Sequence, residues 1–262
     1  MNKTYKKIIL AVLASVTIAG TASAQIYEDK FSYTGALPGN APDTHDTNGN
    51  VWLGLTWSSA PIYANGTAAT GQNYPSGASY GGSFLPVNSA GVTLDGSLGF
   101  TLSATVNTTI FTNGDPSSPA GIELLDSTTP QSSQANVFLA PEAGFFATLG
   151  VNSAGGASGF FNGGSIGTLA GSNTALLQIV YTPGGSPTLS FYDNSVLVSS
   201  QSVTVAQIQA LTDVGINVDY PNHSTITDFT LTLAAAPEPS TYALLLAGLA
   251  GLVFFARRRS LV

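Results

Sequence analysis

The stretch LGFTLSATVNTTI, residues 98–110, alternates apolar and polar side chains over most of its length. Successive side chains of a β-strand point to opposite faces, so one face of this stretch would be apolar and the other lined with hydroxyl groups. The apolar positions are Leu98, Phe100, Leu102, Ala104, Val106 and Ile110, and the polar positions are Thr101, Ser103, Thr105, Asn107 and Thr109. The pattern predicts a strand with one buried face, which is typical of antiparallel sheets.

Alternation or continuous apolar runs predict further strands after this stretch. They cover residues 175–181, 188–192, 195–199 and 214–220, and a last strand carries Phe229, Leu231 and Leu233. The pair Asp193-Asn194 predicts a hairpin turn between two of them, because both residue types tolerate a positive φ. The best candidate for a helix is the short segment 206–211.

Many short strands without βαβ units predict an all-β fold, an antiparallel β-sandwich that occupies residues 25–236. The 29 glycines of the chain fit the many turns that such a fold needs. A parallel β-helix is the alternative that this composition allows, but no repeat of fixed period supports it.

The first 24 residues have the three parts of a secretory signal peptide. Lys3, Lys6 and Lys7 are the positive region, and residues 8–19 are mostly apolar. Ala22-Ser23-Ala24 predicts cleavage between Ala24 and Gln25. A signal helix of twelve apolar residues would span only about 18 Å, too short for a bilayer core of about 30 Å. This segment predicts export through the Sec translocon.

The last 26 residues, 237–262, contain a short motif, an apolar run and a basic cluster in that order. The motif is Pro237-Glu238-Pro239, the apolar run at about 241–256 predicts a single transmembrane helix, and the cluster is Arg257-Arg258-Arg259. Arginines beside a membrane span stay on the cytoplasmic side, which places the body outside the inner membrane.

This tail resembles the PEP-CTERM sorting signal, which exosortase-type membrane transpeptidases recognise. The resemblance implies an exosortase-type transpeptidase as a partner and processing near Pro237-Glu238-Pro239. It also implies an exported protein that is first tethered to the inner membrane. The body would then be released or attached at the cell surface or in the extracellular exopolysaccharide matrix. A tail anchor that is never processed is the alternative.

The charges of the body are strongly asymmetric. Lys30 is its only basic residue against thirteen acidic ones, which gives residues 25–236 a net charge of −12. Phosphate backbones would be repelled, so nucleic acid is excluded as a partner, whereas neutral polysaccharide and divalent cations are allowed. The chain has no cysteine, which excludes disulfides, thiolate metal sites and cysteine nucleophiles.

The body resembles the concanavalin A-like jelly roll in its lectin and laminin-G-like branch. The resemblance rests on an opening strand with Phe31-Ser32-Tyr33 and on the Gly- and Pro-rich loop 35–50 that leads to Trp52. It also rests on the hairpin TLSFYDNSVLV at 188–198 and on a final strand introduced by Thr227-Asp228-Phe229.

Glucanases of this fold make a secreted glycan-active enzyme the alternative function. By resemblance such an enzyme would carry an E-x-D-x-E strand. However, none of the three glutamates of the body, Glu28, Glu123 and Glu142, has an acid two residues away. The two histidines, His45 and His223, lie in turn-rich loops. No catalytic residue is predicted, and the body is interpreted as non-enzymatic.

The loop around Asp43, Asp46 and Asn48 concentrates oxygen ligands, which suit Ca²⁺. A polar, turn-rich loop is the alternative interpretation, and no other cofactor is predicted. Asp219, Asn222 and Asp228 form a second acidic cluster of the same kind.

Trp52 and Trp57 are the candidates for stacking on sugar rings. In an extended strand they would point to opposite faces, so at most one would be in the core; burial of both across a bent strand is the alternative. The sequence predicts a non-catalytic carbohydrate-binding or structural module of the cell surface or matrix.

Overall fold

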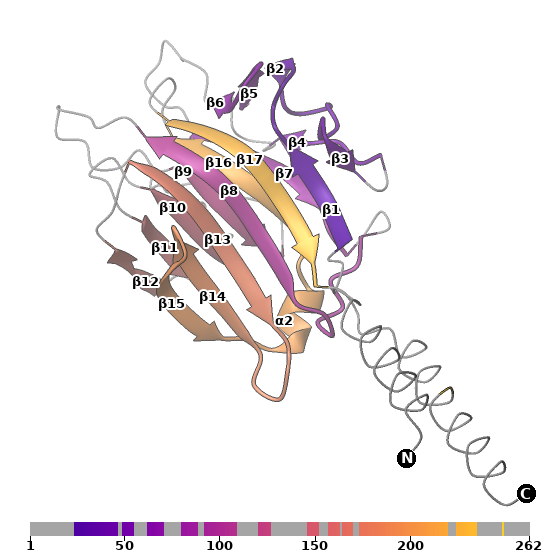
Figure 1. The fold of residues 1–262 in the computed structure, drawn as a ribbon, viewed down its shortest axis with the longest axis vertical. Coiled ribbons are helices and arrows are strands. Elements are labelled where there is room, and N and C mark those ends of the chain that lie inside the picture. The colour runs from indigo at the N-terminus through magenta and orange to yellow at the C-terminus, as the bar shows by residue number, and fades with distance from the viewer. Residues whose placement is uncertain are drawn as a thin grey trace, which may run out of the picture. The chain divides into compact units, whose positions relative to one another are not determined.

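Two antiparallel sheets packed face to face form the body of the protein (Figure 1). The structure is a computed structural model that describes residues 24–46, 49–54, 62–70, 80–88, 92–108, 120–126, 146–151, 157–162, 164–169, 173–219, 224–234 and 248. The chain divides into two compact units, one of residues 23–234 and one of the terminal segments 1–22 and 235–262. Both sheets belong to the first unit.

Ten strands form the sheet nearer the viewer in Figure 1. In order they are β15 (Val196–Ser202), β14 (Thr188–Asp193), β13 (Thr174–Thr182), β8 (Phe100–Thr108), β17 (Ser224–Leu233), β6 (Ala69–Thr70), β5 (Tyr63–Asn65) and β2 (Thr34–Ala36). In addition, β1 (Ala24–Asp29) pairs with β17, and β3 (His45–Asp46) pairs with β1.

Seven strands form the second sheet. In order they are β12 (Gly164–Leu169), β11 (Ala157–Phe161), β10 (Phe146–Val151), β9 (Ala120–Leu125), β16 (Asp213–Asp219), β7 (Tyr80–Pro86) and β4 (Leu53–Gly54). Neighbouring strands pair antiparallel in both sheets, as between β8 and β13 and between β9 and β16. This arrangement confirms the predicted antiparallel sandwich and rules out the β-helix alternative.

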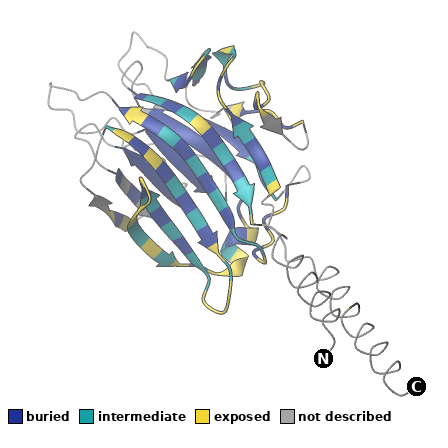
Figure 2. Cartoon of the chain, in the orientation of Figure 1, coloured by how far each residue is buried: buried dark blue, intermediate teal, exposed yellow. Residues whose placement is uncertain are grey.

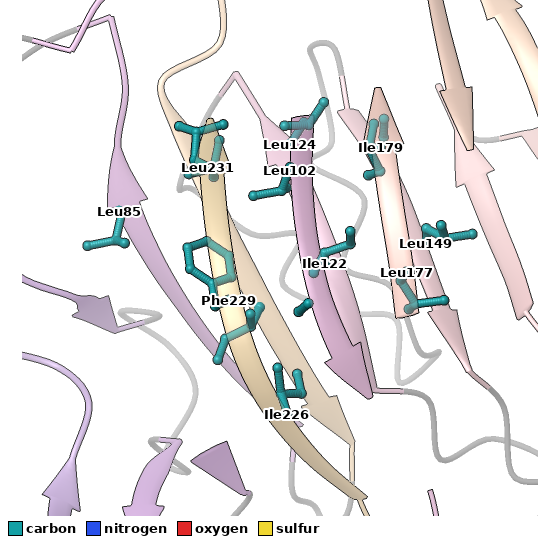
Figure 3. Close-up of a cluster of buried hydrophobic side chains, with 14 of the residues drawn as sticks. Leu85, Leu102, Ile122, Leu124, Leu149, Leu177, Ile179, Ile226, Phe229 and Leu231 are labelled. Atoms are coloured by element: carbon teal, nitrogen blue, oxygen red, sulfur yellow. The ribbon is translucent and has the colours of Figure 1, made fainter. Parts of the chain in front are cut away.

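The core lies between the two sheets and follows the alternation seen in the sequence. In β8 the side chains of Phe100, Leu102, Ala104 and Val106 are buried, and the residues between them are less so (Figure 2). Leucine and isoleucine side chains from both sheets meet in this space (Figure 3). Burying each such side chain stabilises the fold by about 1.5–3 kcal/mol. The strand begins at Phe100, two residues later than predicted, and Ile110 lies outside the described residues.

The predicted hairpin is present, but its turn is one residue further along the chain. Asp193 still pairs with Val196, and the two residues between them, Asn194 and Ser195, have φ of 48° and 68°. Two successive positive φ values are characteristic of a tight turn whose twist matches the flanking strands. Asn194 was therefore correctly predicted as a turn residue, whereas Asp193 ends β14.

The predicted helix exists as the single turn α2 (Val205–Gln209), between β15 and β16. It begins one residue earlier than predicted because Thr204 is its N-cap. The Thr204 hydroxyl accepts a hydrogen bond from the Gln207 backbone N–H, and the Gln207 side chain accepts one from the Thr204 backbone N–H. This reciprocal capping box satisfies two backbone donors at the start of the helix.

The opening strand ends earlier than predicted. β1 stops at Asp29, and Phe31, predicted to be part of the strand, has a positive φ of 56°. β1 lies beside the last strand, with Ala24 opposite Leu233, so both ends of the body are neighbours. Among the described residues no helix is long and apolar enough to cross a membrane. The predicted signal helix and, apart from Gly248, the predicted span 241–256 lie outside those residues.

Candidate functional site

Asp29, at the end of β1, is the centre of a buried hydrogen-bond network. Its Oδ1 accepts a bond of 2.7 Å from the Phe31 backbone N–H, which explains the turn at that residue. Its Oδ2 accepts bonds of 2.7 Å from Trp52 Nε1 and 3.3 Å from the Tyr33 hydroxyl. Burial raises the pKa of Asp29 to about 6, although the bonds from Trp52 and Phe31 act in the opposite direction.

The prediction that Trp52 stacks on a sugar ring is wrong. Its side chain is completely buried, and its ring packs against Phe31 and Phe229 with centroid separations of 6.1 and 5.1 Å. The indole nitrogen is already bonded to Asp29. Trp52 therefore holds the loop after β1 against the last strand. Trp57 lies outside the described residues.

Asp43, predicted as a Ca²⁺ ligand, holds its own loop together. Oδ1 accepts bonds from the Lys30 backbone N–H and the Thr44 hydroxyl, and Oδ2 accepts bonds from the backbone N–H and hydroxyl of Ser32. Burial alone would raise the pKa of Asp43, but these bonds outweigh it and lower the pKa. With four donors, the carboxylate is not arranged as a free cation ligand.

The other two residues of that prediction are not tested. Asp46 of β3 pairs through its backbone with Tyr27 of β1, while its side chain and the whole of Asn48 lie outside the described residues. Within the described ranges no three His, Cys, Asp or Glu side chains form a group that could hold a metal ion. Of the second acidic cluster, Asp219 and Asp228 lie in different sheets, and Asn222 is not described.

The outer face of the seven-stranded sheet carries buried polar groups that the sequence analysis did not single out. Glu123 of β9 lies directly opposite Gly215 of β16 and Thr148 of β10. Asp213 and Asn217 occupy the adjacent outward positions of β16, two residues on either side of Gly215. Glu123, Asn217 and Asp213 are only 1%, 6% and 4% exposed.

Register identifies this face as the outer one. Ile122 and Leu124 of β9 point into the core between the sheets, so Glu123 between them points away from it. Phe84 of β7 is buried but does not belong to the core cluster, and it lies opposite Gly215. A Cβ at Gly215 would overlap the Phe84 ring, which shows that the ring lies against β16.

Glu123 and Asn217 form a hydrogen-bonded pair that is only partly satisfied. Asn217 Nδ2 donates to Glu123 Oε1, whereas the Asn217 carbonyl oxygen is buried without a partner. Burial raises the pKa of Glu123 to about 7, and the bond from Asn217 offsets only part of that shift. Burial also raises the pKa of Asp213. Among the described residues, the outer face of the seven-stranded sheet therefore has fewer hydrogen-bond donors than acceptors around Glu123.

One sequence signal for this pair existed. Glu123 interrupts the apolar run AGIELL, and in the structure all six residues of β9 are buried. An acid in a strand buried on both faces is unusual unless it is paired. Its partner is 94 residues away in the sequence, so the pairing itself was not visible.

The outer face of the ten-stranded sheet has the opposite character, and we call it the hydroxyl face. Its outward residues on β8, β13, β14, β15 and β17 include Thr101, Ser103, Thr105, Asn107, Gln178, Thr188, Ser190, Tyr192, Ser200, Ser202, Thr225, Thr227, Thr230 and Thr232. Hydroxyl pairs link neighbouring strands, as between Ser103 and Thr230 at 2.7 Å. The charged residues described on this face are Asp228, in a bulge of β17, and Glu28 of β1, which lies directly opposite Thr230.

An apolar patch lies at one end of the hydroxyl face. Tyr192 of β14 points outward and is half-buried, with Leu197 of β15 directly opposite it. Gln178 of β13 lies directly opposite Tyr192, and Leu176, two residues before Gln178 on the same face, is a diagonal neighbour of Tyr192. Leu176 and Leu197 are 37% and 51% exposed. This aromatic residue and its apolar neighbours are accessible, unlike Trp52.

The comparisons with known proteins address the tail and the fold separately. Residues 235–260 match the family model described as the PEP-CTERM protein-sorting motif. The predicted sorting tail is therefore confirmed, and the motif implies an exported protein that exosortase sorts and that is transiently anchored in the membrane. No curated protein matches the sequence significantly.

Solved lectin structures share the fold of the body. A structure of peanut lectin with a nine-residue peptide has 13% identity and a TM-score of 0.50, and the match covers 82% of this chain and 98% of that one. The metal-free carbohydrate recognition domain of Emp46p has 9% identity, a TM-score of 0.47 and coverages of 79% and 97%. Basic winged bean lectin with Tn-antigen has 10% identity, a TM-score of 0.46 and coverages of 82% and 99%. The body is a lectin-like β-sandwich of the concanavalin A-like class, as predicted.

Proposed function

We propose that the exported body binds neutral polysaccharide, without hydrolysing it, through the hydroxyl face of the ten-stranded sheet. The observation that carries the proposal is the composition of this face. Its strands present hydroxyl and amide groups outward, with one accessible aromatic residue, Tyr192. The charged residues of this face, Asp228 of β17 and Glu28 of β1, lie on strands at the other side of the sheet from Tyr192. The body as a whole has a net charge of −12.

Hydroxyl groups suit sugars because each can both donate and accept a hydrogen bond, as a sugar hydroxyl does. The patch of Tyr192, Leu176 and Leu197 adds an apolar surface on which the C–H face of a sugar ring can rest. A neutral chain can approach this face without removing water from a charged side chain, which would be unfavourable. The lectin-like fold is consistent with this proposal but does not identify the ligand.

The sorting tail supplies the location that the proposal needs. Cleavage after Ala24 and processing near Pro237-Glu238-Pro239 would deliver the body to the cell surface or to the exopolysaccharide matrix. Replacing Pro237, Glu238 and Pro239 by alanine should leave the body in the inner membrane of a host that has an exosortase. Membrane fractionation and mass spectrometry of the mature C-terminus measure this, and unchanged release would refute processing at the motif.

Binding is tested by isothermal titration of the purified full-length chain with soluble neutral glucans and mannans. Tyr192→Ala should weaken binding at least tenfold, because it removes the aromatic platform. Tyr63→Ala is the matched control, since Tyr63 is also half-buried in the same sheet but lies in β5, away from the patch. Binding should change little between low and high salt, because the contact is uncharged.

Two results would contradict the proposal. Equal losses in both tyrosine variants would show a general effect on stability, and no binding to any neutral polysaccharide would favour a purely structural role. Release of reducing sugars by the wild-type chain would instead identify the alternative, a glycan-active enzyme. In that case a single carboxylate substitution should abolish release.

A further inference from the structure

The pair of Glu123 and Asn217 has fewer hydrogen-bond donors than acceptors among the described residues. Asn217 Nδ2 is the single donor to the Glu123 carboxyl group among them, and the Asn217 carbonyl oxygen has none. Both side chains are more than nine-tenths buried, and they lie on the outer face of their sheet, not between the two sheets. Buried acceptors without donors are unfavourable, so a group that supplies donors would be bound there.

The body contains no cation that could pair with Glu123. Its one lysine or arginine, Lys30, comes directly after β1, a strand of the other sheet. The Lys30 Nζ lies 3.4 Å from Glu28 Oε1. The groups that face Glu123 from the neighbouring strands are Asp213 and Asn217 on β16 and Thr148 on β10, and none of them is basic. A cationic ligand would therefore supply the counter-charge that these strands lack when Glu123 is ionised.

We propose that the outer face of the seven-stranded sheet binds a primary ammonium group beside the hydrogen-bonded pair of Glu123 and Asn217. An ammonium group has three N–H donors and no acceptor. One donor would bond to the Glu123 carboxylate and a second to the Asn217 carbonyl oxygen, so the ligand satisfies both acceptors and neutralises the buried charge. The site is distinct from the hydroxyl face, and the proposal does not depend on the function assigned to that face.

Ca²⁺ fits this place less well. It takes six to eight oxygen ligands, and the described residues of this face offer two carboxyl groups and one amide oxygen on strands that hold them apart by register. A proton is the natural competitor, because a protonated Glu123 could itself donate to the Asn217 carbonyl oxygen. Binding of an ammonium group must therefore displace this proton and weaken as the pH falls.

Amino sugars and simple alkylamines both carry this group, so the experiment separates them. The full-length chain is titrated calorimetrically at pH 7.5 with a glucosamine hexamer, with the N-acetylated hexamer, with ethylamine and with CaCl₂. The glucosamine hexamer should bind, and the N-acetylated hexamer should bind at least tenfold more weakly at this site. Ethylamine binding as tightly as the hexamer would identify a free amine as the ligand source, and weaker ethylamine binding would identify the amino sugar.

Two variants assign the binding to this site. Glu123→Gln should weaken binding of the glucosamine hexamer at least tenfold, whereas Glu28→Gln, the same change on a partly exposed acid of the other sheet, should not. Asn217→Ser is a second variant that removes the amide oxygen and should also weaken binding. Tyr192→Ala should leave amine binding unchanged, so failure of the hydroxyl face and failure of this site are distinguishable.

Proton release provides a readout that needs no variant. Titrations at pH 6.5 in buffers of different ionisation enthalpy should show that the protein loses a fraction of a proton on binding. Equal binding of the glucosamine and N-acetylated hexamers, unchanged binding by Glu123→Gln, or stoichiometric displacement of the amine by Ca²⁺ would each overturn the proposal.

Discussion

Asp29 and Glu123 are both buried carboxyl groups, but their surroundings differ in the number of donors. Asp29 accepts bonds from a backbone N–H, an indole N–H and a phenol hydroxyl. Glu123 accepts one bond, from an amide whose own oxygen has no partner. Asp29 therefore organises the N-terminal loop, whereas Glu123 is poorly compensated. Burial raises the pKa of both groups, so the comparison indicates that the donors decide what a buried acid organises around it and do not cancel the cost of its burial.

The largest effect is expected at Trp52, the main side-chain partner of Asp29. Trp52→Ala removes a ring packed between Phe31 and Phe229, and we expect the free energy of unfolding to fall by about 4 kcal/mol. Trp52→Phe keeps most of the ring but removes the donor to Asp29, with an expected loss of about 2 kcal/mol. Urea denaturation of the full-length chain measures both.

The pH dependence of the Trp52→Phe loss tests the role of Asp29. The indole N–H stabilises the ionised carboxylate, whose pKa is about 6. The loss should therefore be greater at pH 7.5, where Asp29 is ionised, than at pH 4.5, where it is protonated. An equal loss at both pH values would mean that the ring matters and the hydrogen bond does not.

A change of opposite sign is expected at Glu123. Burial raises the pKa of this group from 4.5 to about 7 in the folded protein. The folded state thus retains a proton that the unfolded state has lost between these values, and the free energy of unfolding falls as the pH rises through this window. The total decline for a shift of this size is about 3 kcal/mol.

Glu123→Gln removes this titration because glutamine is neutral at every pH. The variant should resemble the wild type at pH 4.5 and be more stable by up to about 3 kcal/mol at pH 8. Urea denaturation at pH 4.5, 6 and 8 tests this difference. Parallel profiles of variant and wild type would show that the folded protein fully compensates the ionised Glu123 carboxylate.

The smallest effect is expected at Gly215, which lies opposite Glu123. A Cβ there would overlap the Phe84 ring and lie 2.5 Å from the Ser83 carbonyl oxygen. Gly215→Ala should therefore lower the free energy of unfolding by about 2 kcal/mol. Gly185→Ala is the control, because a Cβ at Gly185 meets nothing within 4 Å. Equal stabilities of the two variants would show that the face around Glu123 is loosely packed.

Local patterns predicted much of the fold. The alternation in residues 98–110 identified β8 and its buried side chains, and Asn194 marked the turn of the hairpin. The errors in the fold prediction were at the ends of strands and helices, where a single hydrogen bond sets the last or first residue. Asp29 turns the chain at Phe31, and Thr204 starts α2 one residue before its predicted position.

The site residues were harder to predict, because a single strand does not show what covers its second face. Trp52 was a candidate for stacking on sugar rings, but it is buried against Asp29, 23 residues away. Glu123 was considered only as a candidate catalytic acid, and it was set aside because no second acid lies two residues away. Its partner Asn217 comes from a strand that lies beside β9 only after the sheet has formed.

The sequence by itself determined where this protein goes and which class of fold it adopts. The sorting tail is a contiguous motif, and the alternation of side chains is a property of neighbouring residues. Only the tertiary structure decided which polar groups are exposed on the hydroxyl face and which are buried around Glu123. The physical reason is that burial and hydrogen-bond partners depend on which distant strands become neighbours, and a local period of two cannot specify that.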